Sequence, residues 1–141
     1  MTREEIVNLF NRRREAFARL DAEALAAGHA EDGVVESPAA GGTASGREAI
    51  AKLYRGFFAG FPDLTMEWSD LVIDGDRVVQ MATVSGTDTG GFMGLPATGK
   101  RFRLPVVFVF TLKDGLIAHQ RSVYDFTGML VQIGVLKAKP V

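Results

Sequence analysis

The chain has 141 residues, of which 47% are hydrophobic and 23% charged, and its formal net charge is -1. These values are typical of one globular domain, residues 1–141, and they exclude disordered and collagen-like chains. The near-zero charge gives no electrostatic reason to expect nucleic acid as a partner. The absence of cysteine excludes disulfides, zinc–thiolate sites and thiolate nucleophiles.

The N-terminal segment predicts a protein that is not secreted. Residues 1–17 read MTREEIVNLFNRRREAF, with charges throughout and no apolar run of the signal-peptide kind. The longest strongly apolar stretch, about 104–112, is far shorter than the roughly 20 residues that cross a bilayer. We therefore expect a soluble, cytoplasmic protein with no membrane partner.

The first third of the chain has helical patterns. A capping-box spacing at Thr2 and Glu5 precedes apolar residues that recur on one helix face. The three arginines at 12–14 interrupt this face, and we expect a solvated turn there, with the long stems lying over the core; an anion site is the alternative. A second short helix is predicted from an N-cap at Asp21 to Gly28, with His29 exposed just after it.

A strand and a third helix follow. The β-branched residues at 34–35 predict a short strand that ends at Pro38, and the glycine-rich stretch 39–46 predicts a loop. Ser45 and Glu48 repeat the capping-box spacing. Apolar residues then follow the helical rule from 50 to 58, so this segment is the clearest amphipathic helix, ending at Gly60.

From residue 65 onward the pattern changes to that of strands. Segments 65–73, 77–87, 100–112 and 116–124 are predicted strands, and the turn signals Asp74-Gly75 and Asp114-Gly115 separate two pairs of them. Asp125 is placed as the N-cap of a closing helix. This order predicts an α+β fold: a cone-shaped barrel in which N-terminal helices cover a curved antiparallel sheet and an apolar cavity. Such a cavity is a natural small-molecule site.

Three segments carry a resemblance to a known family. They are GREAIAKLYRGFFAGFPDL at 46–64, DGDRVVQMATVSGTDTGGFMGLPATGKRF at 74–102, and KDGLIAHQRSVYDFTGMLVQIGVL at 113–136. Together they resemble the SnoaL-like polyketide cyclases, or ester cyclases, of the nuclear transport factor 2-like superfamily. That superfamily also holds ketosteroid isomerases and limonene-type epoxide hydrolases. The final YDFTGMLVQIG is the most specific piece of the resemblance.

The chain departs from the family pattern where proton transfer is expected. The resemblance implies a general acid/base aspartate at the position of Ser122, which the epoxide hydrolases share, and a cyclase histidine at about Phe108. It also implies a ketosteroid isomerase base near Ser37. At the positions where the cyclases, the epoxide hydrolases and the ketosteroid isomerases carry their proton-transfer residues, this sequence therefore has residues of another type.

Three residues are candidates for the chemistry. Asp88 lies in Gly-Thr-Asp-Thr-Gly, where a carboxylate at the mouth of an apolar cone would have its charged form disfavoured; a loop aspartate bonded to nearby backbone is the alternative. Glu36, just before Pro38, is a second possible base or a surface glutamate. Ser122 needs a neighbouring base to react, and otherwise marks the wall of the cavity.

Six further residues are predicted to bind the ligand. Tyr124, Gln120 and Ser122 share a strand face, and a buried tyrosine can donate a hydrogen bond to a substrate oxygen. The other predicted contacts are Phe108 by strand parity, Tyr54 and Trp68 as core or ligand contacts, and Phe92 in the glycine-rich loop, closing the cavity or meeting a partner subunit. His119 has the opposite parity from Ser122 and is expected to face away from the cavity. Asp125 is expected only to cap its helix.

No cofactor or metal is expected. The sequence has neither a GxxxxGK[ST] nor a GxGxxG that opens a helix after a strand, and no Gly-x-Ser-x-Gly elbow. The two histidines, His29 and His119, lack the spacing of metal ligands.

Three functional hypotheses follow. The first is a cofactor-free cyclase or isomerase acting by acid/base chemistry on a hydrophobic, carbonyl-bearing, polyketide-like molecule. The second is a non-catalytic small-molecule-binding protein on the same fold, and the third is a limonene-type epoxide hydrolase. The resemblance also implies a homodimer formed through the outer face of the sheet.

Overall fold

The computed structural model describes residues 1–137 and contains a six-stranded sheet with four α-helices. In chain order the elements are α1 (Arg3–Ala18), α2 (Ala22–Ala27), β1 (His29–Ser37), the 3-10 turn η1 (Pro38–Ala40), β2 (Gly42–Ser45), α3 (Arg47–Gly60), β3 (Thr65–Asp74), β4 (Arg77–Thr87), β5 (Arg101–Lys113), β6 (Leu116–Tyr124) and α4 (Phe126–Gln132). The predicted α+β fold is confirmed.

The six strands form one sheet in the order β2-β1-β6-β5-β4-β3. Neighbouring strands pair antiparallel except β1 and β6, which run parallel. A parallel pair needs a long connection, and the intervening chain from α3 through β5 supplies it. This pairing brings the ends of β1 and β6 together, with Glu36 opposite Arg121.

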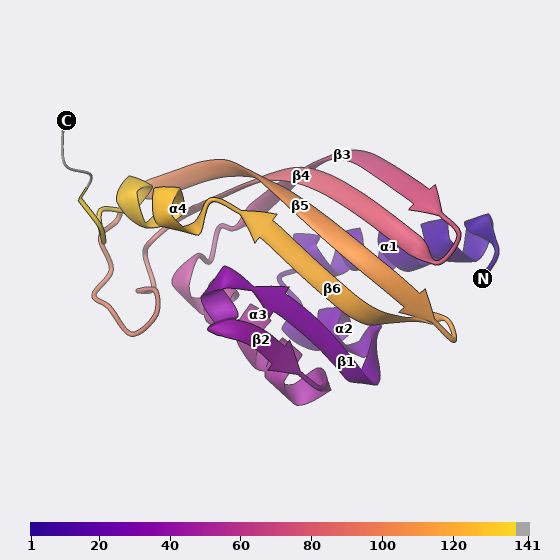
Figure 1. The fold of residues 1–141 in the computed structure, drawn as a ribbon. Coiled ribbons are helices and arrows are strands. Elements are labelled where there is room, and N and C mark those ends of the chain that lie inside the picture. The colour runs from indigo at the N-terminus through magenta and orange to yellow at the C-terminus, as the bar shows by residue number, and fades with distance from the viewer. Residues whose placement is uncertain (138–141) are drawn as a thin grey trace.

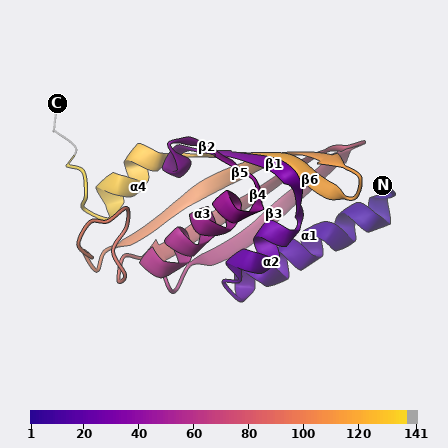
Figure 2. The same ribbon diagram turned by 90° about the horizontal axis from the view of Figure 1, so that it is seen from below.

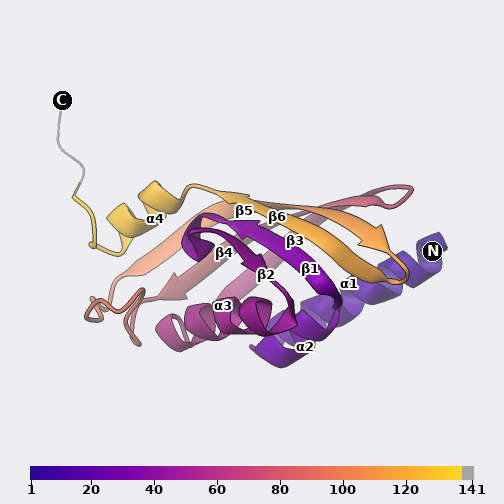
Figure 3. The same ribbon diagram turned by 60° about the horizontal axis from the view of Figure 1, so that its bottom comes forward.

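The helices α1, α2 and α3 cover one face of the sheet, and within residues 1–137 no helix covers the other (Figures 1 and 3). Figure 2 shows the same three helices from below, in front of the strands. The capping box of α1 is confirmed, since the backbone N–H of Glu5 donates to Thr2 Oγ1 at 3.1 Å. The helix α4 follows the end of β6 and packs beside the start of β5, where Gln132 accepts from the backbone N–H of Arg103 at 2.7 Å. It is capped by Asp125, which accepts from the backbone N–H of Gly128 at 2.8 Å.

The region before α3 differs from the prediction. The first strand is longer than expected, and the predicted loop at 39–46 contains η1 and β2. The predicted capping box at Ser45 and Glu48 is wrong, because Ser45 belongs to β2 and Gly46 is the N-cap of α3 without a side-chain hydrogen bond. Gly46 has φ 86°, a conformation that glycine adopts at little cost.

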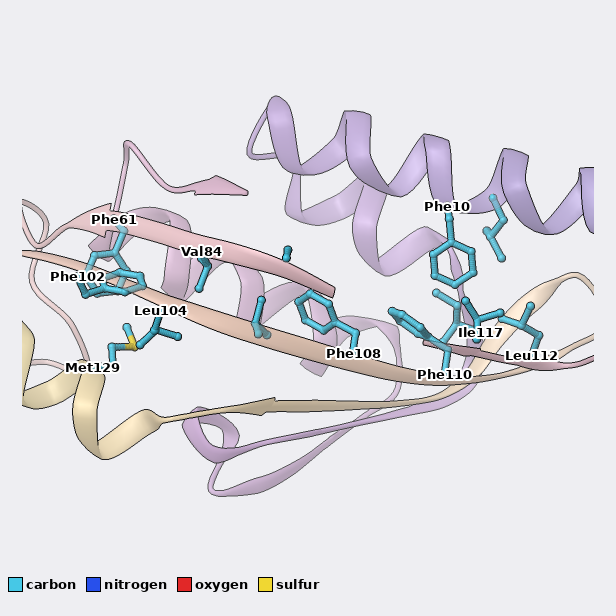
Figure 4. Close-up of a cluster of buried hydrophobic side chains, with 14 of the residues drawn as sticks. Phe10, Phe61, Val84, Phe102, Leu104, Phe108, Phe110, Leu112, Ile117 and Met129 are labelled. Carbon is cyan, nitrogen blue, oxygen red and sulfur yellow. The ribbon is translucent and has the colours of Figure 1, made fainter. Parts of the chain in front are cut away.

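Strand β5 supplies much of the core. Its alternate residues point toward the helices, as the period of a strand requires (Figure 4). Phe110 meets Phe10 of α1 edge-on, with 4.8 Å between ring centroids. The buried residues of β5 are Phe102, Leu104, Val106, Phe108, Phe110 and Leu112.

Among the described residues, no helix has the length and apolar character required to cross a membrane.

Candidate functional site

A hollow lies between α3 and the inner face of the sheet. Aliphatic and aromatic side chains from α3, β4, β5 and α4 form most of its wall, and its polar lining residues are Ser37, Tyr54, Ser122 and Tyr124. The cavity volume is about 60 Å³, which is room for only a few water molecules. A ligand of larger size therefore needs lining side chains to move.

Strand parity placed three of the predicted residues correctly. Ser122 and Tyr124 of β6 both line the hollow, as does Phe108 of β5, which lies opposite Ser122 in the sheet. Their roles in binding stay predictions.

Gln120 is fully buried and joins two hydroxyls of the wall. Its Nε2 donates to the Tyr54 hydroxyl and to Ser122 Oγ, at 3.0 Å each. Nη2 of Arg13 donates to the Tyr54 hydroxyl at 3.0 Å and to Gln120 Oε1 at 3.1 Å. A single network thus links α1, α3 and β6 at one side of the hollow.

The expectation of a solvated turn at 12–14 is wrong, because these residues lie within α1 and Arg13 is only 5% exposed. Its Cζ is 5.2 Å from the ring centroid of Phe17 and 5.5 Å from that of Phe108. Arg13 follows Phe10 by three positions and precedes Phe17 by four, so it shares their helix face. That spacing was a usable signal, which the reading of 12–14 as one charged unit missed.

Ser37 and Tyr124 form a second polar pair, with their oxygens 3.4 Å apart. Burial raises the pKa of Tyr124, opposed by the hydrogen bonds that it makes with Ser37 and the backbone of Ala39. The hydroxyl therefore keeps its proton at neutral pH and can donate it to a ligand.

His29 is fully buried, so its predicted exposure is wrong. It is the first residue of β1, and its backbone pairs with Ile117 of β6. Burial first, and then the positive charges of Arg13 and Arg47, lower the pKa of His29 to about 3. The imidazole is therefore neutral near pH 7.

The two candidate bases do not line the hollow. Asp88 is fully buried at the end of β4, where its Oδ2 accepts from the backbone N–H and the hydroxyl of Thr98 at 3.1 and 3.0 Å. Glu36 lies on the outer face of the sheet with His119, and His119 faces away from the hollow as expected. The catalytic roles of Asp88 and Glu36 stay predictions that this placement does not support.

Trp68 and Phe92 support the wall from behind. Trp68 of β3 packs against Phe17, with 5.4 Å between centroids, and is not among the lining residues. Phe92 reaches from the loop between β4 and β5 to Phe57 and Phe61, at 5.5 and 5.1 Å between centroids. Because Phe57 lines the hollow, Phe92 covers that part of its wall.

Within residues 1–137, no three histidine or acidic side chains gather as a metal site.

A family model described as SnoaL-like polyketide cyclase matches residues 8–133. The chain belongs to this family. Among solved structures, the SnoaL-like chain is 28% identical to TsrD from Streptomyces laurentii, with a TM-score of 0.83 and coverage of 96% of this chain and 99% of TsrD. It is also 28% identical to AclR from Streptomyces galilaeus, provisionally described as a hydroxylase, with a TM-score of 0.82 and coverage of 99% and 87%.

A third similar structure is IdmH from Streptomyces antibioticus, provisionally described as a polyketide cyclase. It is 30% identical, with a TM-score of 0.74 and coverage of 91% of this chain and 97% of IdmH. Solved structures of lower identity share the ketosteroid isomerase-like and NTF2-like fold. No curated protein matches the sequence.

Proposed function

We propose that this SnoaL-like protein is a cofactor-free cyclase or isomerase that acts on a hydrophobic, carbonyl-bearing molecule of polyketide type. The observation that carries the proposal is the apolar hollow, whose wall holds the hydroxyls of Tyr54, Ser122 and Tyr124. The apolar wall favours a hydrophobic ligand. The hydroxyls can donate to a carbonyl oxygen, on which negative charge grows when a neighbouring C–H bond gives up its proton.

The second candidate is a binding protein without catalysis, and a specific observation favours it. Among the described lining residues of the hollow there is no carboxylate and no histidine, although proton abstraction needs an acceptor within reach. The epoxide hydrolase hypothesis is weakened for the same reason, since that reaction needs carboxylates to activate water.

Deuterium exchange can separate the two candidates without knowledge of the natural substrate. We would incubate the protein with 2-acetylnaphthalene in D2O and follow the methyl protons beside the carbonyl by NMR. A catalyst of enolisation exchanges them faster than buffer alone, and Ser122→Ala and Tyr54→Phe slow the exchange. Saturable binding of the ketone with exchange at the buffer rate would instead identify a binding protein.

We also propose that two copies pair through the outer face of the sheet. Alternate residues of β4, β5 and β6 place an apolar patch there, formed by Val79, Met81, Val107, Val109 and Val123. Val123 is 49% exposed, and the other members of the patch are partly exposed. Light scattering should give a dimer mass at micromolar concentration and a monomer mass for Val123→Asp. A monomer in the unsubstituted protein would contradict the proposal.

The predicted cytoplasmic location, and the extent of the domain over all of residues 1–141, stay predictions.

A further inference from the structure

Arg13 carries a buried positive charge to which no carboxylate is bonded. Its side chain is 5% exposed, and within residues 1–137 it forms no ion pair. Nε and Nη1 have no hydrogen-bond partner in the described part of the chain. A guanidinium keeps its charge in proteins, and a buried charge without a counter-charge is costly.

The surroundings of Arg13 compensate only part of that cost. The rings of Phe17, Tyr54, Phe108 and Phe110 lie 5.0 to 5.9 Å from its Cζ and supply cation–π attraction. His29 is close enough to feel the charge of Arg13 and is neutral. The only polar partners are neutral groups, the Tyr54 hydroxyl and the Gln120 amide oxygen, among the residues that the structure describes.

Hydrogen bonds connect Arg13 with two hydroxyls that line the hollow, directly for Tyr54 and through Gln120 for Ser122. The Tyr54 oxygen accepts from Arg13 and from Gln120 Nε2, so its own proton is left for Gln120 Oε1, at a long 3.4 Å, or for a ligand. Ser122 Oγ accepts from the same Nε2, so its proton is also left for a ligand. Both hydroxyls line the hollow, and both are bonded to one nitrogen.

We infer that the hollow binds its ligand as an oxyanion, a hydrophobic molecule with a carboxylate or enolate oxygen that accepts from Tyr54 and Ser122. Arg13 is then a positioning residue: it supplies the counter-charge through Tyr54 and Gln120. The inference rests on the proposed function, because it names the chemical class of the ligand for the same site. It explains why a charge is kept behind an apolar wall.

A matched pair of probes tests the inference. 2-Naphthoate and 2-naphthamide have nearly the same shape, and at pH 7 only the first is an anion. Calorimetric titration should show naphthoate binding roughly tenfold to a hundredfold more tightly to the unsubstituted protein, the range expected for hydrogen bonds to a charged group. Arg13→Met should bring the ratio of the two affinities close to one, Arg13→Lys should restore part of it, and the neighbouring Arg14→Met should leave it unchanged.

Gln120→Glu gives a second test in case Arg13→Met does not fold. This change places a carboxylate against Arg13 inside the protein, so the preference for naphthoate should vanish although Arg13 is still present. The melting temperature of the free variant should not fall, because the buried charge gains a counter-ion.

The outcomes separate the inference from the proposed function. Equal binding of the two probes, or a preference that survives both Arg13→Met and Gln120→Glu, would overturn the inference and leave the hollow as a binding site. Failure of both probes to bind would overturn the inference together with the proposed site.

Discussion

Glu36 and His119 contact each other across β1 and β6, with 2.9 Å between Oε2 and Nε2. Their side chains are 43% and 42% exposed, on the face of the sheet opposite the hollow. Ser37 is one position from Glu36 along β1, and Ser122 is three positions from His119 along β6. Because these separations are odd, the two serines face the other side of the sheet and line the hollow. Alternation along two parallel strands therefore separates the acidic residue of β1 from the polar wall of the cavity.

Replacing Glu36 by Gln should leave proton exchange on 2-acetylnaphthalene within about twofold of the unsubstituted rate. The free energy of unfolding should change by less than about 1 kcal/mol, because exposed polar side-chain pairs contribute little, even when both partners are charged. His119→Gln, which removes the other partner, serves as the control. A tenfold or larger loss of exchange in Glu36→Gln alone would identify Glu36 as the proton acceptor.

Asp88→Ala should lower the free energy of unfolding by roughly 1–3 kcal/mol, because two donors of Thr98 lose their acceptor in a partly buried place. Asp63→Ala is a matched control. Asp63 accepts from the backbone and hydroxyl of Thr87 in the same way, but at the surface, where water can replace it. Urea unfolding measures both. If Asp88→Ala lowered the free energy of unfolding no more than Asp63→Ala does, the burial of Asp88 would add nothing to the stabilisation by its hydrogen bonds.

His29 should make the protein less stable in acid. The unfolded chain takes up a proton on this residue below about pH 6.5, whereas the folded protein does so only near its lowered pKa of about 3. Between these values the unfolded state binds more protons, so stability falls as the pH is lowered. His29→Leu removes this effect.

The difference in unfolding free energy between His29→Leu and the unsubstituted protein should therefore shift by roughly 2 kcal/mol in favour of the variant from pH 7 to pH 5. Urea unfolding at several pH values measures the shift, whatever the offset at pH 7. If the unfolding free energies of the two proteins changed with pH by the same amount over this range, the imidazole of His29 would not be buried in its neutral form.

Gly90→Ala should destabilise the protein by roughly 3 kcal/mol, the upper part of the range for overpacked sites. A Cβ at this position would lie 1.8 Å from the carbonyl oxygen of Ala59 at the end of α3, and that atom is backbone that cannot rotate away. Gly56→Ala is the control, because its Cβ would meet nothing within 4 Å on α3, and it should stabilise by about 1 kcal/mol. Thermal unfolding of the two variants should shift in opposite directions.

The sequence determined the elements from α3 onward, because their apolar residues recur with a clear helical or strand spacing and recognisable turn residues separate them. The strands 77–87 and 116–124 have the predicted bounds, and strand parity alone placed Ser122, Tyr124 and Phe108 on the inner face. Local patterns suffice there because a strand with one buried face fixes the side to which each residue points.

Only the tertiary structure decided what lies behind the wall of the hollow. The burial of Arg13 and His29 depends on α1 packing over β5 and on β1 running parallel to β6. Local spacing places Arg13 on the helix face of Phe10, but it does not say which groups that face meets. The distances that join Arg13, Tyr54, Gln120 and Ser122 link residues far apart in the chain. Long-range packing therefore set the electrostatics of the candidate site, because a charge acquires its effect from the groups that surround it and not from its place in the sequence.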